Sequence, residues 1–132
     1  MDNFPDRRLC VINVSKGGVM IASDVAWANT SRERRRGLLG RSGLSNCEGI
    51  YLTPCEWIHT FGMKFPIDVA FLSADGQILV VHHSLKPYRL SRMVLRAQGV
   101  LELTAGTLLR SGTAVGDDVQ FVGSATHDLM SL

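Results

Sequence analysis

One apolar stretch of the chain, from Cys55 to Leu72, carries several side chains that could do chemistry. It reads CEWIHTFGMKFPIDVAFL and combines a thiol, an imidazole, a thioether and a carboxylate. In an extended strand, side chains alternate between the two faces, so the odd-numbered positions share one face. The residues that this alternation groups together are Cys55, Trp57, His59, Phe61 and Met63. The pattern fits a binding site, and it fits equally a well-packed core that contains one histidine.

A metal site is the first hypothesis for this stretch. A thiolate, an imidazole and a thioether suit copper(I), and Cys55, His59 and Met63 would supply them. On a straight strand, however, Cys55 and Met63 lie ~26 Å apart, which is too far for one mononuclear site. The chain would have to bend, for example at Gly62, or take a ligand from elsewhere. We therefore favour packing for the cysteine and methionine and a hydrogen-bonded core position for His59, and we predict no cofactor.

A second hypothesis concerns Asp68, which lies within an apolar run. A buried carboxylate is costly unless it is paired, so Asp68 is predicted to have a partner. The candidate partners are His59, Lys64, Arg36, Arg41 and nearby backbone N–H groups. An arginine would make a structural brace between helix and sheet, which is the favoured interpretation. Pairing with His59 inside a cleft would instead allow acid–base chemistry, with Cys55 or Cys47 as a nucleophile.

The length and composition are those of an ordinary globular domain. The chain has 132 residues, of which 45% are hydrophobic and 20% are charged. No apolar run reaches the ~18 residues of a membrane-spanning helix, so no span is predicted. The first residues include acids and lack a small-residue cleavage site, so we predict no secretory signal and a cytoplasmic location.

The charge distribution bears on the partner. The formal net charge is +2, and eleven of the fourteen basic residues are arginine. Arginine binds phosphate and carboxylate in a bidentate manner, which mildly favours an anionic partner, although a solvated basic face is the favoured interpretation. Aromatic residues do not alternate with these arginines as they do in single-strand nucleic-acid binders, so a nucleic-acid partner is not expected.

Three cysteines argue against a disulfide framework. Cys10, Cys47 and Cys55 are odd in number and have no CxxC spacing, which also argues against structural zinc. Free thiols are predicted, and pairing of Cys47 with Cys55 stays open.

Strand and turn signals predict a mainly β fold. Short runs rich in β-branched residues, separated by glycine, proline and Asp-Gly signals, predict seven to eight short strands. The expected strands are 9–14, 19–26, 48–52, 67–72, 77–83, 99–103 and 119–122. This pattern favours an antiparallel β-sandwich or jelly-roll-like barrel. We expect a loose tail at residues 1–8 and a single β-sandwich domain over residues 9–132.

One short helix is predicted at about 31–39. Thr30 can cap its start, and Glu33 completes a capping box. Gly40 is expected to end it in the left-handed conformation. A helical turn is also expected near 105–111.

Several ordered blocks run along most of the chain, roughly from Val19 to Val122. The blocks are Thr30 with Glu33 and the run RGLLGR at 36–41, Glu48-Gly49-Ile50, His59 with Met63 and Pro66-Ile67-Asp68, Asp75-Gly76, and Val100-Leu101-Glu102-Leu103 followed by Gly112 and Gly116-Asp117. In their order and spacing the chain resembles the prokaryotic family of uncharacterised proteins known as domain of unknown function 192. The resemblance implies a compact, jelly-roll-like β-sandwich and no established activity. Gly62 stands where many members carry a tryptophan.

The preferred hypothesis is a small binding or accessory module. Its cleft would lie near His59, Met63 and Asp68 and would be rimmed by the basic helix. The remaining candidate binding residues are Cys55, Arg36 and Arg41. One alternative is an enzyme of unknown reaction that uses His59, Asp68 and a cysteine; no catalytic motif supports it. Another is an interaction subunit without small-molecule chemistry. The ligand, the partner (a small molecule or a protein) and the oligomeric state stay open.

Overall fold

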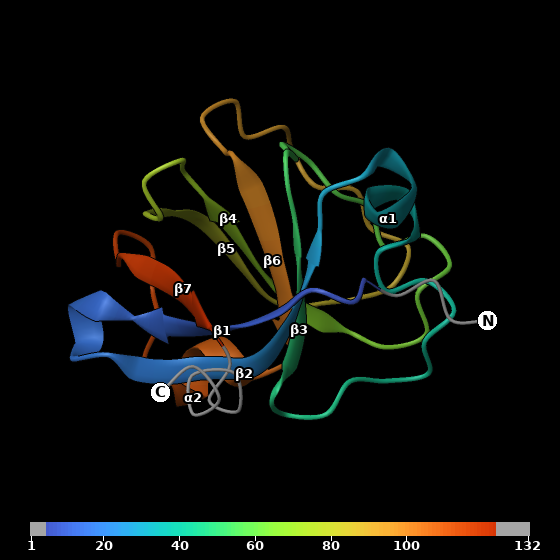
Figure 1. Ribbon diagram of the computed structural model, residues 1–132. Coiled ribbons are helices and arrows are strands. Elements are labelled where there is room, and N and C mark those ends of the chain that lie inside the picture. The colour runs from blue at the N-terminus through green and yellow to red at the C-terminus, as the bar shows by residue number, and fades with distance from the viewer. Residues whose placement is uncertain (1–4, 124–132) are drawn as a thin grey trace.

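Seven strands form one sheet in the computed structural model, which describes residues 5–123 (Figure 1). Along the sheet they lie in the order β5-β4-β6-β3-β2-β1-β7. Their bounds are β1 Arg8–Asn13, β2 Val19–Ala28, β3 Glu48–Leu52, β4 Ile67–Leu72, β5 Ile78–Leu85, β6 Gly99–Thr104 and β7 Val119–Gly123. The predicted mainly β fold of short strands is confirmed.

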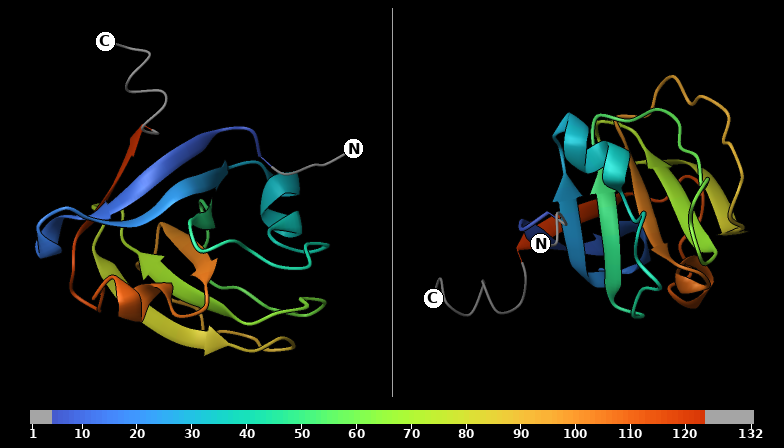
Figure 2. Two further views of the ribbon diagram at one scale, coloured as in Figure 1. Left: turned by 90° about the horizontal axis from the view of Figure 1, so that it is seen from below. Right: turned by 90° about the vertical axis from the view of Figure 1, so that its right-hand side faces the viewer.

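The sheet is mixed and curls into a half-barrel (Figure 2). Every neighbouring pair is antiparallel except β2 and β3, which are parallel. Parallel neighbours need a crossover connection, and residues 29–47 supply it with the helix α1, Ser31–Arg36. The expected arrangement was antiparallel throughout. The single parallel pair differs because strand signals in a sequence do not specify pairing partners.

The two edge strands of the sheet approach each other at one end. The Ile78 N–H donates to the Asp117 carbonyl at 2.8 Å, and the Val119 N–H donates to the Gly76 carbonyl at 2.9 Å. These bonds join the start of β5 to the start of β7, so the curled sheet is partly closed there.

Both faces of the sheet are buried. All six residues of β4 are buried, and they alternate between two hydrophobic clusters. Val69 and Phe71 belong to the cluster that includes Leu38, next to α1. Ala70 belongs to the other cluster, which includes Leu108 of α2, Thr107–Arg110. A strand covered on both sides is apolar almost throughout, which explains the composition of β4.

The predicted capping box of α1 is confirmed, and its predicted end is wrong. Thr30 Oγ1 accepts the Glu33 N–H, and Glu33 Oε1 accepts the Thr30 N–H, both at 3.1 Å. The helix ends at Gly37, whose φ of +49° favours glycine, rather than near Gly40. Turns follow through residue 40, and they bury Leu38.

The predicted start of the folded part of the chain differs from the observed one. Residues 1–4 and 124–132 lie outside the described residues, so the expected tail at 1–8 is only partly covered. Arg8 already belongs to β1, and the Trp27 N–H donates to the Arg7 carbonyl at 2.9 Å. A single turn of 3₁₀-helix, Val14–Lys16, joins β1 to β2. No helix between residues 5 and 123 has the length and apolarity needed to cross a membrane.

Candidate functional site

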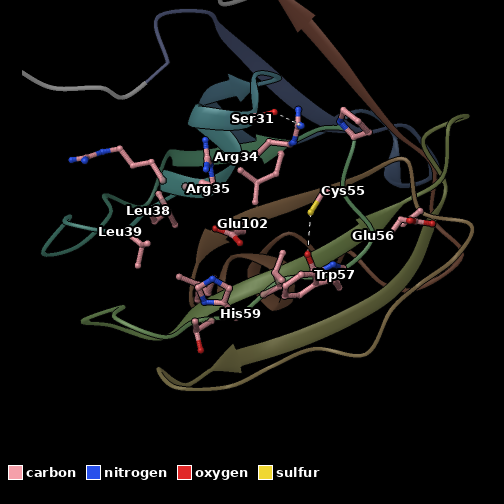
Figure 3. A pocket seen from close by; sticks show the side chains of 18 of the residues that line it. Ser31, Arg34, Arg35, Leu38, Leu39, Cys55, Glu56, Trp57, His59 and Glu102 are labelled. Carbon is pink, nitrogen blue, oxygen red and sulfur yellow. Dashed lines mark hydrogen bonds between the residues drawn. The ribbon is translucent and has the colours of Figure 1, made fainter.

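A cavity of about 1110 Å³ lies beside α1. Three parts of the chain form its walls: α1 with the turns that follow it, the irregular segment 54–60 after β3, and residues 95–98 before β6. In Figure 3 the Glu102 side chain stands in the middle of the cavity, with α1 on one side and the residues from Cys55 to His59 on the other. The apolar part of the lining is formed mainly by Leu38, Leu39, Leu52, Ile58, Met63, Ile67 and Ala97.

Glu102 is the most unusual side chain of this cavity. It lies on β6, directly opposite Ile50 and Val69 of the neighbouring strands, and only 4% of it is exposed. Within residues 5–123 no hydrogen bond reaches its carboxylate. Burial raises the pKa of Glu102 from its ordinary value of 4.5 to about 7, and no neighbouring charge counteracts this. Near neutral pH the carboxyl group can therefore be either protonated or ionised.

Glu102 was not among the binding residues predicted from the sequence. It was named there only as part of the run from Val100 to Leu103. The same argument that singled out Asp68, a carboxylate inside an apolar strand, applies equally to Glu102. That signal was available, and it would have found the residue.

His59 lies at the wall of the cavity and is exposed. Its ring is flanked by Trp57 and Phe61, with centroids 6.3 and 5.3 Å away, and its Nδ1 accepts the Phe61 N–H at 3.2 Å. The backbone of segment 54–60 is hydrogen-bonded to residues 88–98: the Thr60 N–H donates to the Arg89 carbonyl and the Val94 N–H to the Glu56 carbonyl, both at 2.8 Å, and His59 forms an isolated bridge with Leu90. His59 is therefore an accessible ring on an irregular segment, and its expected core position is wrong.

Cys55 and Met63 also line the cavity. The Cys55 thiol donates to the Trp57 carbonyl at 3.1 Å (Figure 3), and burial is the main cause that raises the pKa of this thiol. A thiol kept protonated is a poor nucleophile. Met63 is buried in the cluster next to α1. Across residues 5–123, no three His, Cys, Asp or Glu side chains gather as metal ligands would.

Asp68 is fully buried on the other side of the sheet. Its carboxylate accepts three backbone N–H groups, from Ser84 at 2.9 Å, Gly106 at 3.1 Å and Leu108 at 3.0 Å. The predicted partner therefore exists, and it is backbone rather than histidine or arginine. Alternation along β4 places Asp68 with Ala70, away from the cavity, so the structure does not bring Asp68 and His59 together. Asp68 ties the start of α2 to β5.

Some arginine side chains near the cavity are held by hydrogen bonds or ion pairs, and others are exposed. Arg34 donates to the carbonyls of Asn29 and Thr53 at 2.8 and 3.4 Å, which holds α1 against the end of β3. Arg35 and Arg36 line the cavity and are exposed. Arg41 does not line the cavity; it pairs with Glu48 at 3.1 Å.

The Glu48 carboxylate is the acidic half of that pair. Burial is the largest single influence on its pKa and raises it, but the Ser45 N–H and the Arg41 guanidinium together outweigh burial. The pKa of Glu48 therefore lies below its usual value, which marks a satisfied, structural carboxylate.

Two solved structures share the fold of this chain, and one family model matches most of it. The family model of DUF192, described as Uncharacterized ACR, matches residues 12–121. A crystal structure of a protein of unknown function from Novosphingobium aromaticivorans DSM 12444 is 23% identical, with a TM-score of 0.75, covering 85% of this chain and 83% of that one. A crystal structure from Sinorhizobium meliloti 1021, of a candidate transcription regulator, is 24% identical, with a TM-score of 0.77, covering 91% and 98%. No curated protein matches the chain.

Proposed function

This chain belongs to the DUF192 family, and we propose that it is a small binding module that holds a small organic molecule in the cavity between α1 and segment 54–60. The observation that carries the proposal is the Glu102 carboxylate, which has no hydrogen-bond partner among the described residues and meets the cavity from a residue that is only 4% exposed. Folded proteins satisfy nearly all of their buried polar groups. A carboxylate left unsatisfied beside an open cavity is therefore ready to bind a group supplied from outside.

The size and lining of the cavity support the same proposal. Ligand sites are mostly apolar hollows of roughly 300–1,000 Å³ with a few polar groups that orient the ligand. Here Leu38, Ile58 and Met63 contribute apolar wall, and Glu102 and His59 contribute polar groups. The expected cytoplasmic location is kept as part of the proposal.

The enzyme alternative has less support than binding. It required His59 to be oriented by Asp68, and a cysteine as nucleophile. Asp68 instead accepts three backbone N–H groups on the other side of the sheet, and the Cys55 thiol has a raised pKa. Between residues 5 and 123, no histidine is hydrogen-bonded to a carboxylate that could orient it as a base.

An interaction subunit is the second candidate. The loop between β5 and β6 exposes several large apolar side chains, which a protein partner could cover. They are Tyr88, Leu90, Met93 and Leu95, exposed by 66, 63, 57 and 76%. The mass of the protein in solution distinguishes self-association through this loop from a monomer.

The binding proposal is tested by thermal shift against a chemically diverse set of small molecules. A ligand that binds only the folded state stabilises it by about 2.7 kcal/mol at a hundredfold excess over Kd. We expect some compounds to raise the Tm of the wild-type protein and to do so much less for Glu102→Gln. Asp118→Asn is the matched control, because it makes the same carboxylate-to-amide change at an exposed position outside the cavity.

Two results would contradict the proposal. One is a wild-type protein that responds to no compound. The other is an equal response of wild type and Glu102→Gln to every compound that binds, which would place the site elsewhere.

A further inference from the structure

The cavity is lined by charges of both signs, with the Glu102 carboxylate in its middle and several arginines around it. We infer that its ligand is amphoteric, with an ammonium or similar cationic group that pairs with Glu102 and an anionic group held by arginines at the cavity mouth. This inference rests on the proposed function and specifies the chemistry of the molecule bound there.

Within the described residues, Glu102 has no positively charged partner. An ionised carboxylate taken out of water is costly unless an opposite charge or several donors meet it. Burial is the cause that raises the pKa of Glu102, and no ion pair joins Glu102 to an arginine within residues 5–123. A cationic group of a ligand would supply both the countercharge and the missing hydrogen bonds.

Arginines give the lining of the cavity a positive charge, and the part of the lining that they form is called the mouth here. Arg34, Arg35 and Arg36 reach the cavity from α1, and Arg96 reaches it from the segment before β6. Apart from Glu102, the only carboxylate in the lining is Glu56. The Arg34 side chain is engaged as a brace. The side chains of Arg35, Arg36 and Arg96 are exposed and make no hydrogen bond or ion pair within the described residues. Guanidinium groups placed in this way bind carboxylate or phosphate.

A ligand that carries only one charge, or no charge, leaves part of the cavity lining without a partner. A purely cationic molecule has to pass the arginines, which repel it. A purely anionic molecule is held at the mouth and leaves the Glu102 carboxylate unpaired. A neutral molecule leaves the arginines without a counterion. A molecule that carries both charges pairs with the arginines and with the ionised form of Glu102 at the same time.

Binding of such a molecule has a proton signature with a definite sign. The titratable groups that line the cavity together with Glu102 are Cys55, Glu56, His59 and the arginines. An ammonium group favours the ionised form of Glu102, so complex formation near pH 7 transfers the carboxyl proton to the buffer. A ligand that instead offers a hydrogen-bond acceptor favours the protonated form and takes a proton up.

The experiment uses the full chain and a graded set of probes. The amphoteric probes are ω-amino acids from glycine to 8-aminooctanoate, each compared with its N-acetyl derivative and its methyl ester. Affinity is measured by isothermal titration calorimetry in buffers of different ionisation enthalpy. We expect at least one free amino acid to bind about tenfold or more tightly than both of its blocked forms, with release of protons. Glu102→Gln should lose the preference for the free amine and the proton release.

A second pair of variants tests the mouth independently of Glu102. Arg35→Ala with Arg36→Ala changes only exposed side chains, so folding should be kept. It should weaken binding of the free acids and should not weaken binding of the cationic methyl esters. Asp118→Asn should behave as the wild type with every probe.

The outcomes separate the two proposals. N-acetyl derivatives that bind as tightly as the free amines, proton uptake, or unchanged affinity in Glu102→Gln would overturn the amphoteric ligand. If only uncharged compounds from the broader set bind, and Glu102→Gln weakens them, the binding module stands and the amphoteric ligand falls. If no compound of any class binds, both proposals fall.

Discussion

Two buried carboxylates show how residue-level surroundings separate structure from function. Asp68 and Glu102 lie on adjacent strands within the same sheet, and each is almost completely buried. Asp68 accepts three backbone N–H groups, whereas Glu102 meets none within residues 5–123 and faces a cavity. The difference in hydrogen-bond partners, rather than in residue type or burial, assigns Asp68 to the fold and Glu102 to the candidate site.

The raised pKa of Glu102 predicts an unusual pH dependence of stability. The folded protein holds the proton up to about pH 7, while the unfolded chain releases it near 4.5, so the free energy of unfolding should fall as the pH rises between these values. The shift corresponds to a loss on the order of 3 kcal/mol. The Glu102→Gln variant has no carboxyl group to titrate at this position. The free energy of unfolding of the variant minus that of wild type should therefore increase from pH 4.5 to 7 and stay constant above pH 7. Urea unfolding across this range measures it.

Glu48→Gln is the control of opposite sign. The lowered pKa of Glu48 gives the wild type stability that is present above pH 4.5 and is lost as the pH falls through the folded pKa. Glu48→Gln should therefore be less stable than wild type at neutral pH, and the difference should close in acid. Curves for wild type and Glu102→Gln that run parallel from pH 4.5 to 8 would refute the assigned pKa shift.

At the scale of the element, a short helix has to hold one wall of the cavity. With six residues, α1 is far below the length at which an isolated helix is stable in water. Its position depends on the capping box, on the brace from Arg34 to the end of β3, and on burial of Leu38 just beyond its end. The walls are therefore placed by contacts at the ends of α1, and weakening one end should loosen the cavity.

Thr30→Ala should cost about 1 kcal/mol of unfolding free energy, because it removes the acceptor of the Glu33 N–H at the helix start. It should also speed hydrogen exchange of the Arg34 amide, which donates to the Thr30 carbonyl in the first turn. Thr30→Ser keeps a hydroxyl acceptor and should stay close to wild type in both measurements. Equal losses in the two variants would show that the side-chain cap does not hold the helix.

At the scale of the whole molecule, the partial closure of the half-barrel depends on one close approach. Gly76 has a φ of +89°, and a Cβ there would lie 2.5 Å from the Val119 carbonyl oxygen. The same pair makes the hydrogen bond from the Val119 N–H to the Gly76 carbonyl that joins the two edges of the sheet. A side chain at this position would have to push the edges apart.

Gly17 offers a matched comparison for this closure. Its φ of +70° is also left-handed, but a Cβ there meets no atom within 4 Å. Gly17→Ala should cost about 1–2 kcal/mol from backbone strain alone, and Gly76→Ala about 1–3 kcal/mol more from the clash. Denaturant unfolding of both variants measures the difference. Similar costs at the two sites would mean that the edges separate easily and that closure adds little stability.

Local signals predicted much of the fold and only part of the site. The strands at 48–52 and 67–72, the Asp75-Gly76 turn and the start of α1 were all predicted at the positions where they are observed. His59, Met63 and Arg36 do line a common cavity, although whether it binds anything stays a prediction. The irregular course of segment 54–60 was not predicted, because contacts across the chain, such as the bridge from His59 to Leu90, shape it.

By itself, the sequence determined which stretches are strands, where α1 starts and that Asp68 must have a partner, because alternation, capping and the cost of burying charge act within a few residues. Only the tertiary structure decided that Asp68 is satisfied by backbone, that Arg41 pairs with Glu48 outside the cavity, and that Glu102 stands unmatched within it. The physical reason is that alternation shows which residues share a face of a strand, but the pairing of distant strands decides which face is filled and which is hollow.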